Sequence, residues 1–173
     1  MADGVIGQMM ESLTLPEPVK YDYDPEWKMG RVVNGEANIH TSIYMEYDDL
    51  EALNHKLQAK YKLIQETEQR CEELETEDAE LVIVAYGICS RVASGVVSIL
   101  RKEGLKVGLV RPQMVFPFPS DTLQKLVNKG NVKTFVSLEM SAGQMIEDVR
   151  LATECKRPVT LCNGAGGMIP SPD

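Results

Sequence analysis

Short runs of β-branched and aliphatic residues recur through the second half of the chain and predict four β-strands. The runs are residues 81–86, 107–110, 132–138 and 158–162. Almost every position of the first and third runs is apolar, which indicates strands that are buried on both faces. Such strands are typical of a parallel sheet covered by helices on its two sides.

Between these runs the apolar positions follow helical spacing, and glycines mark the helix ends. The first predicted helix runs from Arg91 to about Lys102, capped by Ser90 and closed by Gly104. The second has Ser120 or Asp121 as its cap and stops at Gly130. The third carries the apolar residues Met145, Ile146, Val149 and Ala152. Alternating strands and helices predict a three-layer α/β/α domain with an open, mostly parallel sheet of four to five strands.

The first 77 residues follow a different pattern, which predicts an extended linker and one long helix. Prolines and glycines within residues 16–35 are typical of extended or hairpin-containing segments. A heptad repeat then predicts a helix over about residues 48–75, with a narrow apolar seam. The repeating residues are Leu50, Leu57, Ile64 and Cys71. Two interpretations stay open: a strut that lies along the α/β domain or a partner subunit, and a self-associating coiled coil.

The composition is that of a soluble globular protein, with 43% hydrophobic and 25% charged residues. No apolar run approaches the roughly 18 residues of a membrane span, and the N-terminus lacks a secretory signal pattern, so we expect a cytoplasmic protein. The net charge of −8 is unevenly divided, with −11 on residues 1–78 and +3 on residues 79–173. Because neither part has a dense basic cluster, we expect no nucleic-acid partner.

The cysteines and histidines show neither a metal-binding spacing nor a nucleophile–base pair. No C-x-x-C pattern predicts a zinc or iron–sulfur site, and Cys89 and Cys162 are expected to be buried near strand ends. Ser90 and Cys89 have no histidine partner, because no histidine follows His55. The turn 87–91 is a generic anion site at a helix start, but it lacks the three-glycine dinucleotide spacing.

The carboxyl ends of parallel strands meet at one edge of a sheet, where open sheets bind ligands and partners. Loops rich in glycine or proline follow the predicted strands. We therefore predict a candidate interface at this edge, formed by Arg111, Glu139, Gln144, Asn163, Gly166 and Gly167. The alternative, that these residues only satisfy helix ends, stays open. Glu139 together with Glu147 and Asp148 also suggests acid–base chemistry, for which solvated acids at a helix start are the more ordinary explanation.

Five motifs occur in a recognisable order and spacing. They are Ala2–Glu11, Asp78–Gly87, Val107–Pro112, Phe116–Pro119, and Glu139-Met140 with Gly143–Arg150. Together they resemble the α-subunit of the 2-oxoacid:ferredoxin oxidoreductases, closest to the branched-chain, or 2-ketoisovalerate, type. The resemblance implies that residues 1–15 end a pyrimidine-binding domain, that residues 16–77 are a linker, and that residues 78–173 are a domain similar to the transketolase C-terminal domain.

The resemblance also implies a function. Such enzymes are oxidoreductases that use thiamine diphosphate to decarboxylate a 2-oxoacid oxidatively, pass electrons to ferredoxin and transfer the acyl group to coenzyme A. Thiamine diphosphate, magnesium and iron–sulfur clusters are expected on other domains or subunits, with no catalytic, cofactor-binding or metal-binding residue in this chain. The chain is then a C-terminal fragment that serves as scaffold and as an interface to other subunits.

Two further interpretations stay open. One is a stand-alone flavodoxin-like module that binds a phosphate-containing ligand at the 87–91 turn. The other is an interaction module built on the long helix.

Overall fold

The computed structural model describes residues 4–10, 12, 14–20, 28–30, 32–33, 35–39 and 41–171. The chain divides into two compact units, Met1–Met9 with Lys62–Asp173, and Met10–Tyr61. The predictions above also fall on residues 1–3, 11, 13, 21–27, 31, 34, 40, 172 and 173, which lie outside the described residues.

Five strands form one sheet in the larger unit. In spatial order they are β3 (Cys71–Leu74), β5 (Val107–Pro112), β4 (Leu81–Ala85), β6 (Thr134–Glu139) and β7 (Val159–Asn163). The last four are parallel to one another, and β3 is antiparallel to β5. The prediction of a mostly parallel sheet of four to five strands is therefore confirmed.

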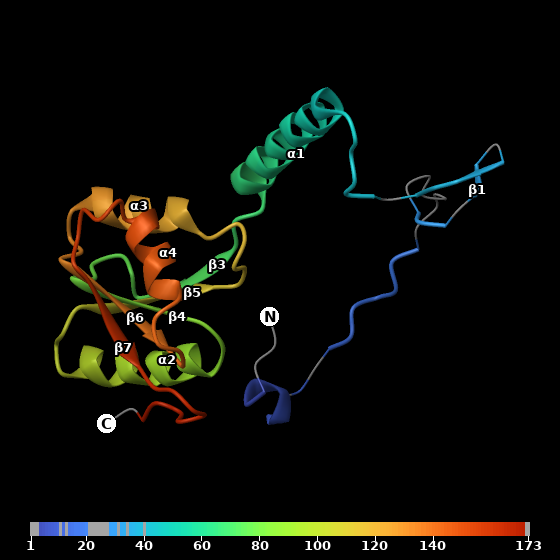
Figure 1. Cartoon of the computed structure of the whole chain (residues 1–173). Helices are drawn as coiled ribbons and strands as arrows, with labels where there is room; N and C mark the ends of the chain where they lie inside the picture. The colour runs from blue at the N-terminus through green and yellow to red at the C-terminus, as the bar shows by residue number, and fades with distance from the viewer. Residues whose placement is uncertain are drawn as a thin grey trace. The chain divides into compact units, whose positions relative to one another are not determined.

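Helices cover both faces of this sheet. In Figure 1, α2 (Gly87–Lys102) lies on one side, and α3 (Ser120–Lys129) and α4 (Met145–Ala152) lie on the other. Gly104 and Gly130 follow α2 and α3 with φ values of +86° and +85°, so glycine ends these helices as the sequence predicted. The three-layer α/β/α architecture is confirmed.

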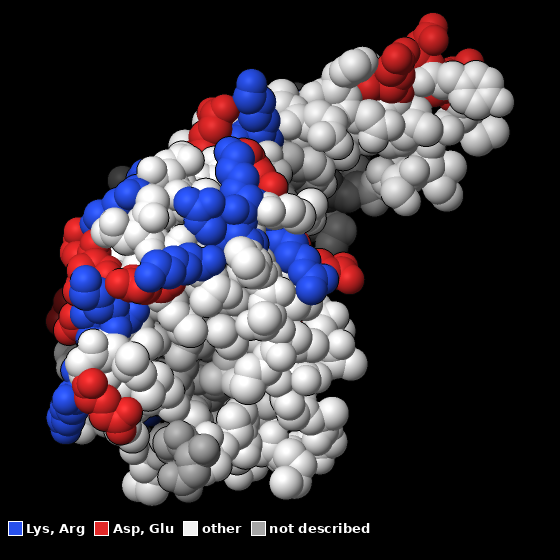
Figure 2. Space-filling view, turned by 90° about the vertical axis from the view of Figure 1, so that its left-hand side faces the viewer, with Lys and Arg blue, Asp and Glu red and all other residues white. Residues whose placement is uncertain are grey.

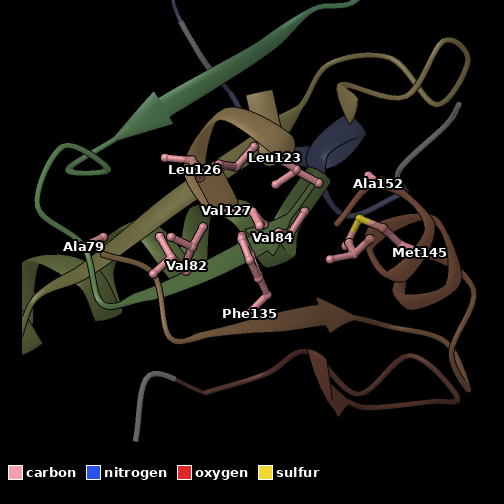
Figure 3. Close-up of a cluster of buried hydrophobic side chains, with 12 residues drawn as sticks. Ala79, Val82, Val84, Leu123, Leu126, Val127, Phe135, Met145 and Ala152 are labelled. Carbon is pink, nitrogen blue, oxygen red and sulfur yellow. The ribbon is translucent and has the colours of Figure 1, made fainter. Parts of the chain in front are cut away.

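The alternation of side chains along β4 explains the two hydrophobic layers. Val82 and Val84 belong to a buried cluster with residues of α3 and α4, and Figure 3 shows both valines among the side chains of this cluster. Ile83 and Ala85 belong to a second buried cluster, on the α2 side. Each face of the central strand therefore packs against helices, which is why its sequence is continuously apolar.

The starts of α2 and α3 differ from the prediction. Ser90 lies inside the first turn of α2, where its hydroxyl donates to the carbonyl of Gly87 at 2.7 Å, and it does not cap the helix. Gly87 has a φ of +58°, and the chain turns from β4 into the helix four residues earlier than expected. Helix α3 begins at Ser120 directly after Pro119, without a side-chain cap from the residue at its N-cap position.

The predicted long helix is too long by about two turns. Helix α1 spans Tyr47–Thr67, and Cys71–Leu74 is the edge strand β3 rather than the end of a helix at residue 75. Backbone pairing with β5, from Cys71↔Pro112 to Leu74↔Leu109, outweighs the heptad pattern. Cys71 therefore packs against the core cluster beneath α3 and α4 instead of continuing the helical seam.

The smaller unit contains the predicted hairpin. Strands β1 (Val32–Val33) and β2 (Glu36–Ala37) are antiparallel.

No residue of α1 is buried. No helix in the described ranges has both the length and the apolar character that a membrane crossing requires. A short 3₁₀ turn, η1 (Ile6–Gln8), belongs to the larger unit.

Candidate functional site at the carboxyl edge of the sheet

The four parallel strands end at one edge of the sheet. The paired registers place Ala85 beside Leu138 and Glu139 beside Asn163. The chain runs from β4 to β5 on one side and returns to β6 on the other, so the point between β4 and β6 is the topological switch point of the sheet. In open sheets this is the usual position of a ligand site.

The switch point is almost closed in this domain. Its crevice has a volume of about 60 Å³, and Tyr86, Cys89 and Glu139 are among its lining residues. Small-molecule pockets usually have roughly 300 to 1,000 Å³, so the crevice has room for about two water molecules only. Neither a nucleotide nor thiamine diphosphate fits there, which counts against the flavodoxin-like interpretation.

Glu139 is buried at this edge, and its side chain caps the start of α4. The residue is 1% exposed, so the expectation of a solvated acid was wrong for Glu139. Its carboxylate accepts hydrogen bonds from five donors, because β6 ends directly below the start of α4. The donors are the hydroxyls of Ser137 at 3.0 Å and Ser141 at 2.6 Å and the backbone N–H groups of Gln144 at 2.8 Å, Met145 at 3.1 Å and Ile146 at 3.1 Å.

The pKa values of Glu139 and Asp148, the two acids at the start of α4 whose pKa is shifted, move in opposite directions. Burial by itself would raise the pKa of Glu139, but the hydrogen bonds from Ser141 and the three backbone N–H groups lower it below its ordinary value. Burial, followed by the charges of Glu147 and Glu139, raises the pKa of Asp148. Glu139 is thus an enclosed carboxylate that stabilises a helix end, which does not support the acid–base hypothesis for this residue.

Hydrogen bonds join the loop after β6 to the end of β7. The Asn163 side-chain amide donates to the carbonyl of Ser141 at 2.7 Å, and the N–H of Gly164 donates to the Glu139 carbonyl at 3.2 Å. Three of the predicted residues, Glu139, Gln144 and Asn163, therefore lie together around the end of β6. Of these three residues, Glu139 is buried, whereas Gln144 and Asn163 are exposed.

Arg111, on β5, lies two strands away from β6. Arg111 pairs with Glu72 on the neighbouring strand β3 at 2.9 Å, and Gln113 donates to the same carboxylate at 2.7 Å. The sequence did not predict this pair, because residue 72 was assigned to a helix. Gly166 and Gly167 follow β7 with φ values of +67° and +85° and have open space around their Cα hydrogens.

The cysteines and the charged surface show no further chemical site in the described chain. Cys89 is buried as predicted, whereas Cys162 is exposed because it lies on the outermost strand, β7. No group of three or more metal-ligating residues occurs among the residues that the structure describes. In Figure 2, basic and acidic side chains lie beside one another along the left and centre of the face, and a group at the upper right is acidic only.

A groove beside this edge was not predicted. It has a volume of about 550 Å³ and is lined by the end of α1, the loop between β5 and α3, and α4. Only the Phe116–Pro119 motif within that loop had been singled out in the sequence. The groove joins segments that are far apart along the chain, which is why no local pattern indicated it.

Comparison with known proteins identifies the family. Residues 79–173 match the family described as "Pyruvate:ferredoxin oxidoreductase core domain II". The chain belongs to this family. Ketoisovalerate oxidoreductase subunit VorB of Methanothermobacter marburgensis is 47% identical over 170 residues, which are 98% of this chain and 47% of the relative. The resemblance to 2-oxoacid:ferredoxin oxidoreductases is confirmed.

Two further matches are less similar in sequence. The 2-oxoglutarate synthase subunit KorA of Methanocaldococcus jannaschii is 28% identical over 197 residues, covering 100% of this chain and 52% of the relative. A solved 2-oxoglutarate:ferredoxin oxidoreductase from Magnetococcus marinus shares the fold, with a TM-score of 0.63 and 21% identity over 75% of this chain and 22% of that chain. The chain spans about half the length of the curated relatives it matches.

Proposed function

We propose that this chain is part of the α-subunit of a thiamine-diphosphate-dependent 2-oxoacid:ferredoxin oxidoreductase of the 2-ketoisovalerate type. The observation that carries the proposal is the 47% identity to a VorB subunit over 98% of the chain. The complete enzyme decarboxylates the 2-oxoacid oxidatively to an acyl-CoA, with ferredoxin as electron acceptor, in the cytoplasm.

Within this enzyme we assign the chain a scaffold and interface role. Residues 1–15 end the pyrimidine-binding domain, residues 16–77 are the linker, and residues 78–173 form the transketolase C-terminal-like domain. Thiamine diphosphate, magnesium and the iron–sulfur clusters bind to other domains or subunits. The 60 Å³ crevice supports this assignment, since the position that binds a ligand in many open sheets has no room for a diphosphate cofactor.

The carboxyl edge of the sheet forms the interface to the other subunits. Arg111, Gln144, Asn163, Gly166 and Gly167 supply its exposed polar groups and its glycine backbone. Glu139 contributes from beneath, because its five hydrogen bonds hold the start of α4 and the loop that carries Gln144. A rigid edge loses little conformational entropy when a partner binds to it.

The test is the activity of the complete enzyme. The gene that encodes this chain is co-expressed anaerobically with its partner subunits, and CoA-dependent ferredoxin reduction is measured with 2-ketoisovalerate, pyruvate and 2-oxoglutarate. We expect the highest kcat/KM with 2-ketoisovalerate. A purified, cofactor-loaded complex that oxidises none of the three acids would contradict the proposed function, and a preference for pyruvate or 2-oxoglutarate would contradict the substrate assignment.

A further inference from the structure

The 550 Å³ groove has one apolar wall that is open to solvent. Val115, Phe116 and Leu151 line it, with 55%, 53% and 74% of their surfaces exposed. Val115 and Phe116 come from the loop after β5, and Leu151 comes from α4. Large apolar side chains that gather in one groove with a polar rim are typical of a binding surface.

The rim of the same groove is acidic. Among the described residues, Glu66, Asp121 and Asp148 line it together with one basic residue, Lys62. No salt bridge joins the three carboxylates to a Lys or Arg within residues 41–171. The pKa of Asp148 is raised by burial and then by the like charges of Glu147 and Glu139, so its surroundings in this chain disfavour its negative charge.

The walls of the groove are joined by a specific contact. The backbone N–H of Asp121, at the start of α3, donates to the side-chain carbonyl oxygen of Gln69 at 3.0 Å. This bond links the segment after α1 to the segment that begins α3. The groove therefore exists before anything binds, and preorganisation of this kind lowers the entropic cost of association.

We infer that this groove is the docking site for a segment of another subunit that presents an arginine or lysine beside an aliphatic or aromatic side chain. The apolar side chain packs on Val115 and Leu151, and the cation reaches Asp148. The inference rests on the proposed function, because it takes this chain to be part of a multi-subunit enzyme. Charge complementarity selects a basic segment. Two copies of this chain that met through the groove would bring their acidic rims together, which disfavours a second copy as the occupant.

A photo-crosslinking experiment on the assembled enzyme identifies the occupant. A benzophenone amino acid replaces Leu151, whose exposure allows the substitution without disturbing the core, and a matched probe replaces Ile99 on α2 at the opposite face of the sheet. After irradiation, mass spectrometry of the complex should show a peptide of another subunit that contains Lys or Arg, crosslinked from position 151 and not from position 99. A crosslink only to a second copy of this chain, only within this chain, or to no chain at all would overturn the inference.

Charge variants test the role of the acidic rim in the same complex. Asp148→Asn should raise the dissociation constant for subunit assembly about tenfold or more, and Asp148→Lys should raise it further. The matched control is Glu147→Gln on the same helix turn, since Glu147 does not line the groove and should change the constant less than about twofold. Sedimentation at several salt concentrations measures the constant, and thermal unfolding checks that each variant is folded.

The outcomes separate this inference from the proposed function. If Asp148→Lys and the control assemble equally well and the enzyme still oxidises 2-ketoisovalerate, the groove is not the docking site and the proposed function stands. If the wild-type complex assembles through the groove but oxidises no 2-oxoacid, the proposed function is wrong while the docking site stands.

Discussion

Glu139 shows how one side chain determines the local structure of the carboxyl edge. Its carboxylate accepts hydrogen bonds from the first N–H groups of α4, which water would otherwise solvate. The Glu139 residue itself is only 1% exposed. A buried carboxylate is tolerated only when such donors surround it. Removing the charge while keeping the shape therefore tests the whole arrangement.

We predict that Glu139→Gln lowers the free energy of unfolding by about 2 to 4 kcal/mol, because buried N–H groups lose a charged acceptor. Since the pKa of Glu139 is lowered by folding, its contribution is complete above the unfolded-state pKa of about 4.3 and is lost as the pH falls through the lower folded-state pKa. Urea unfolding of the wild type and of Glu139→Gln should be measured from pH 7 down to acidic pH. The difference between their free energies of unfolding should decrease only at acidic pH. The exposed neighbour Glu147→Gln should change stability by less than about 0.5 kcal/mol, and equal losses for both variants would contradict the capping role.

Arg111 and Gln144 allow the interface and structural explanations to be separated. Arg111→Ala or Gln144→Ala should change the stability of this chain by less than about 1 kcal/mol, because both residues are exposed. The same substitutions should weaken subunit assembly or turnover of the complete enzyme. Chemical denaturation of the chain and sedimentation of the enzyme measure the two effects. A loss of several kcal/mol in the chain without a further loss in the enzyme would make the residues structural.

At the scale of secondary structure, three of the four strands that the sequence predicted, β4, β5 and β6, are largely buried, whereas the fourth, β7, has no buried residue. Strand β4 is the example, since Val82 and Ile83 face opposite helix layers. Strand β3 was missed because Cys71–Leu74 contains two glutamates and has little apolar character of its own. It forms a strand through pairing with β5, a tertiary interaction that a local pattern does not contain.

For the candidate residues, the sequence predicted the edge of the sheet at which they lie but not the partners of their side chains. That the strand ends converge follows from parallel topology, so Glu139 and Asn163 were placed at one edge from the sequence alone. That Glu139 points inward depends on where α4 begins above the sheet, and that Arg111 meets Glu72 depends on strand β3. Both details require the packed structure.

Gly108 on β5 is required by close packing of the turn that follows β3. A Cβ at this position would lie 2.8 Å from the carbonyl oxygen of Glu75 and 3.1 Å from the Cα of Thr76. Gly108→Ala should therefore destabilise the chain by about 1 to 3 kcal/mol. Gly95→Ala on α2 is the control, since open space surrounds that glycine, and it should stabilise the chain by about 0.5 to 1 kcal/mol. Thermal unfolding measures both, and a neutral Gly108→Ala would show that the turn moves freely.

The seam residues of helix α1 are not buried: Leu57 and Ile64 are half-buried, and Leu50 is 38% exposed. A peptide covering Tyr47–Thr67 should therefore show weak helicity in water that increases with concentration, because a short helix without a packed face is marginal. Circular dichroism at several concentrations measures this. Strong helicity at low micromolar concentration would favour the coiled-coil interpretation over the strut.

For the chain as a whole, the scaffold assignment predicts an inactive protein when it is isolated. We expect no 2-oxoacid decarboxylation and no saturable binding of thiamine diphosphate with magnesium, because the switch-point crevice has only about 60 Å³. Isothermal titration calorimetry checks the binding. Saturable affinity in the micromolar range would show a cofactor site that the described residues do not reveal.

The order of strands also gives the sheet two unequal edges. Strand β3 forms one edge and carries Glu72, which pairs with Arg111, and Glu73, which accepts a hydrogen bond from Thr76. Charged side chains on an edge strand disfavour the addition of another strand. Strand β7, Val159–Asn163, lies at the other edge of the described sheet and has no charged residue. Any growth of this sheet by backbone pairing, whether in ordered assembly or in aggregation of a subunit made without its partners, therefore proceeds in one direction, from β7.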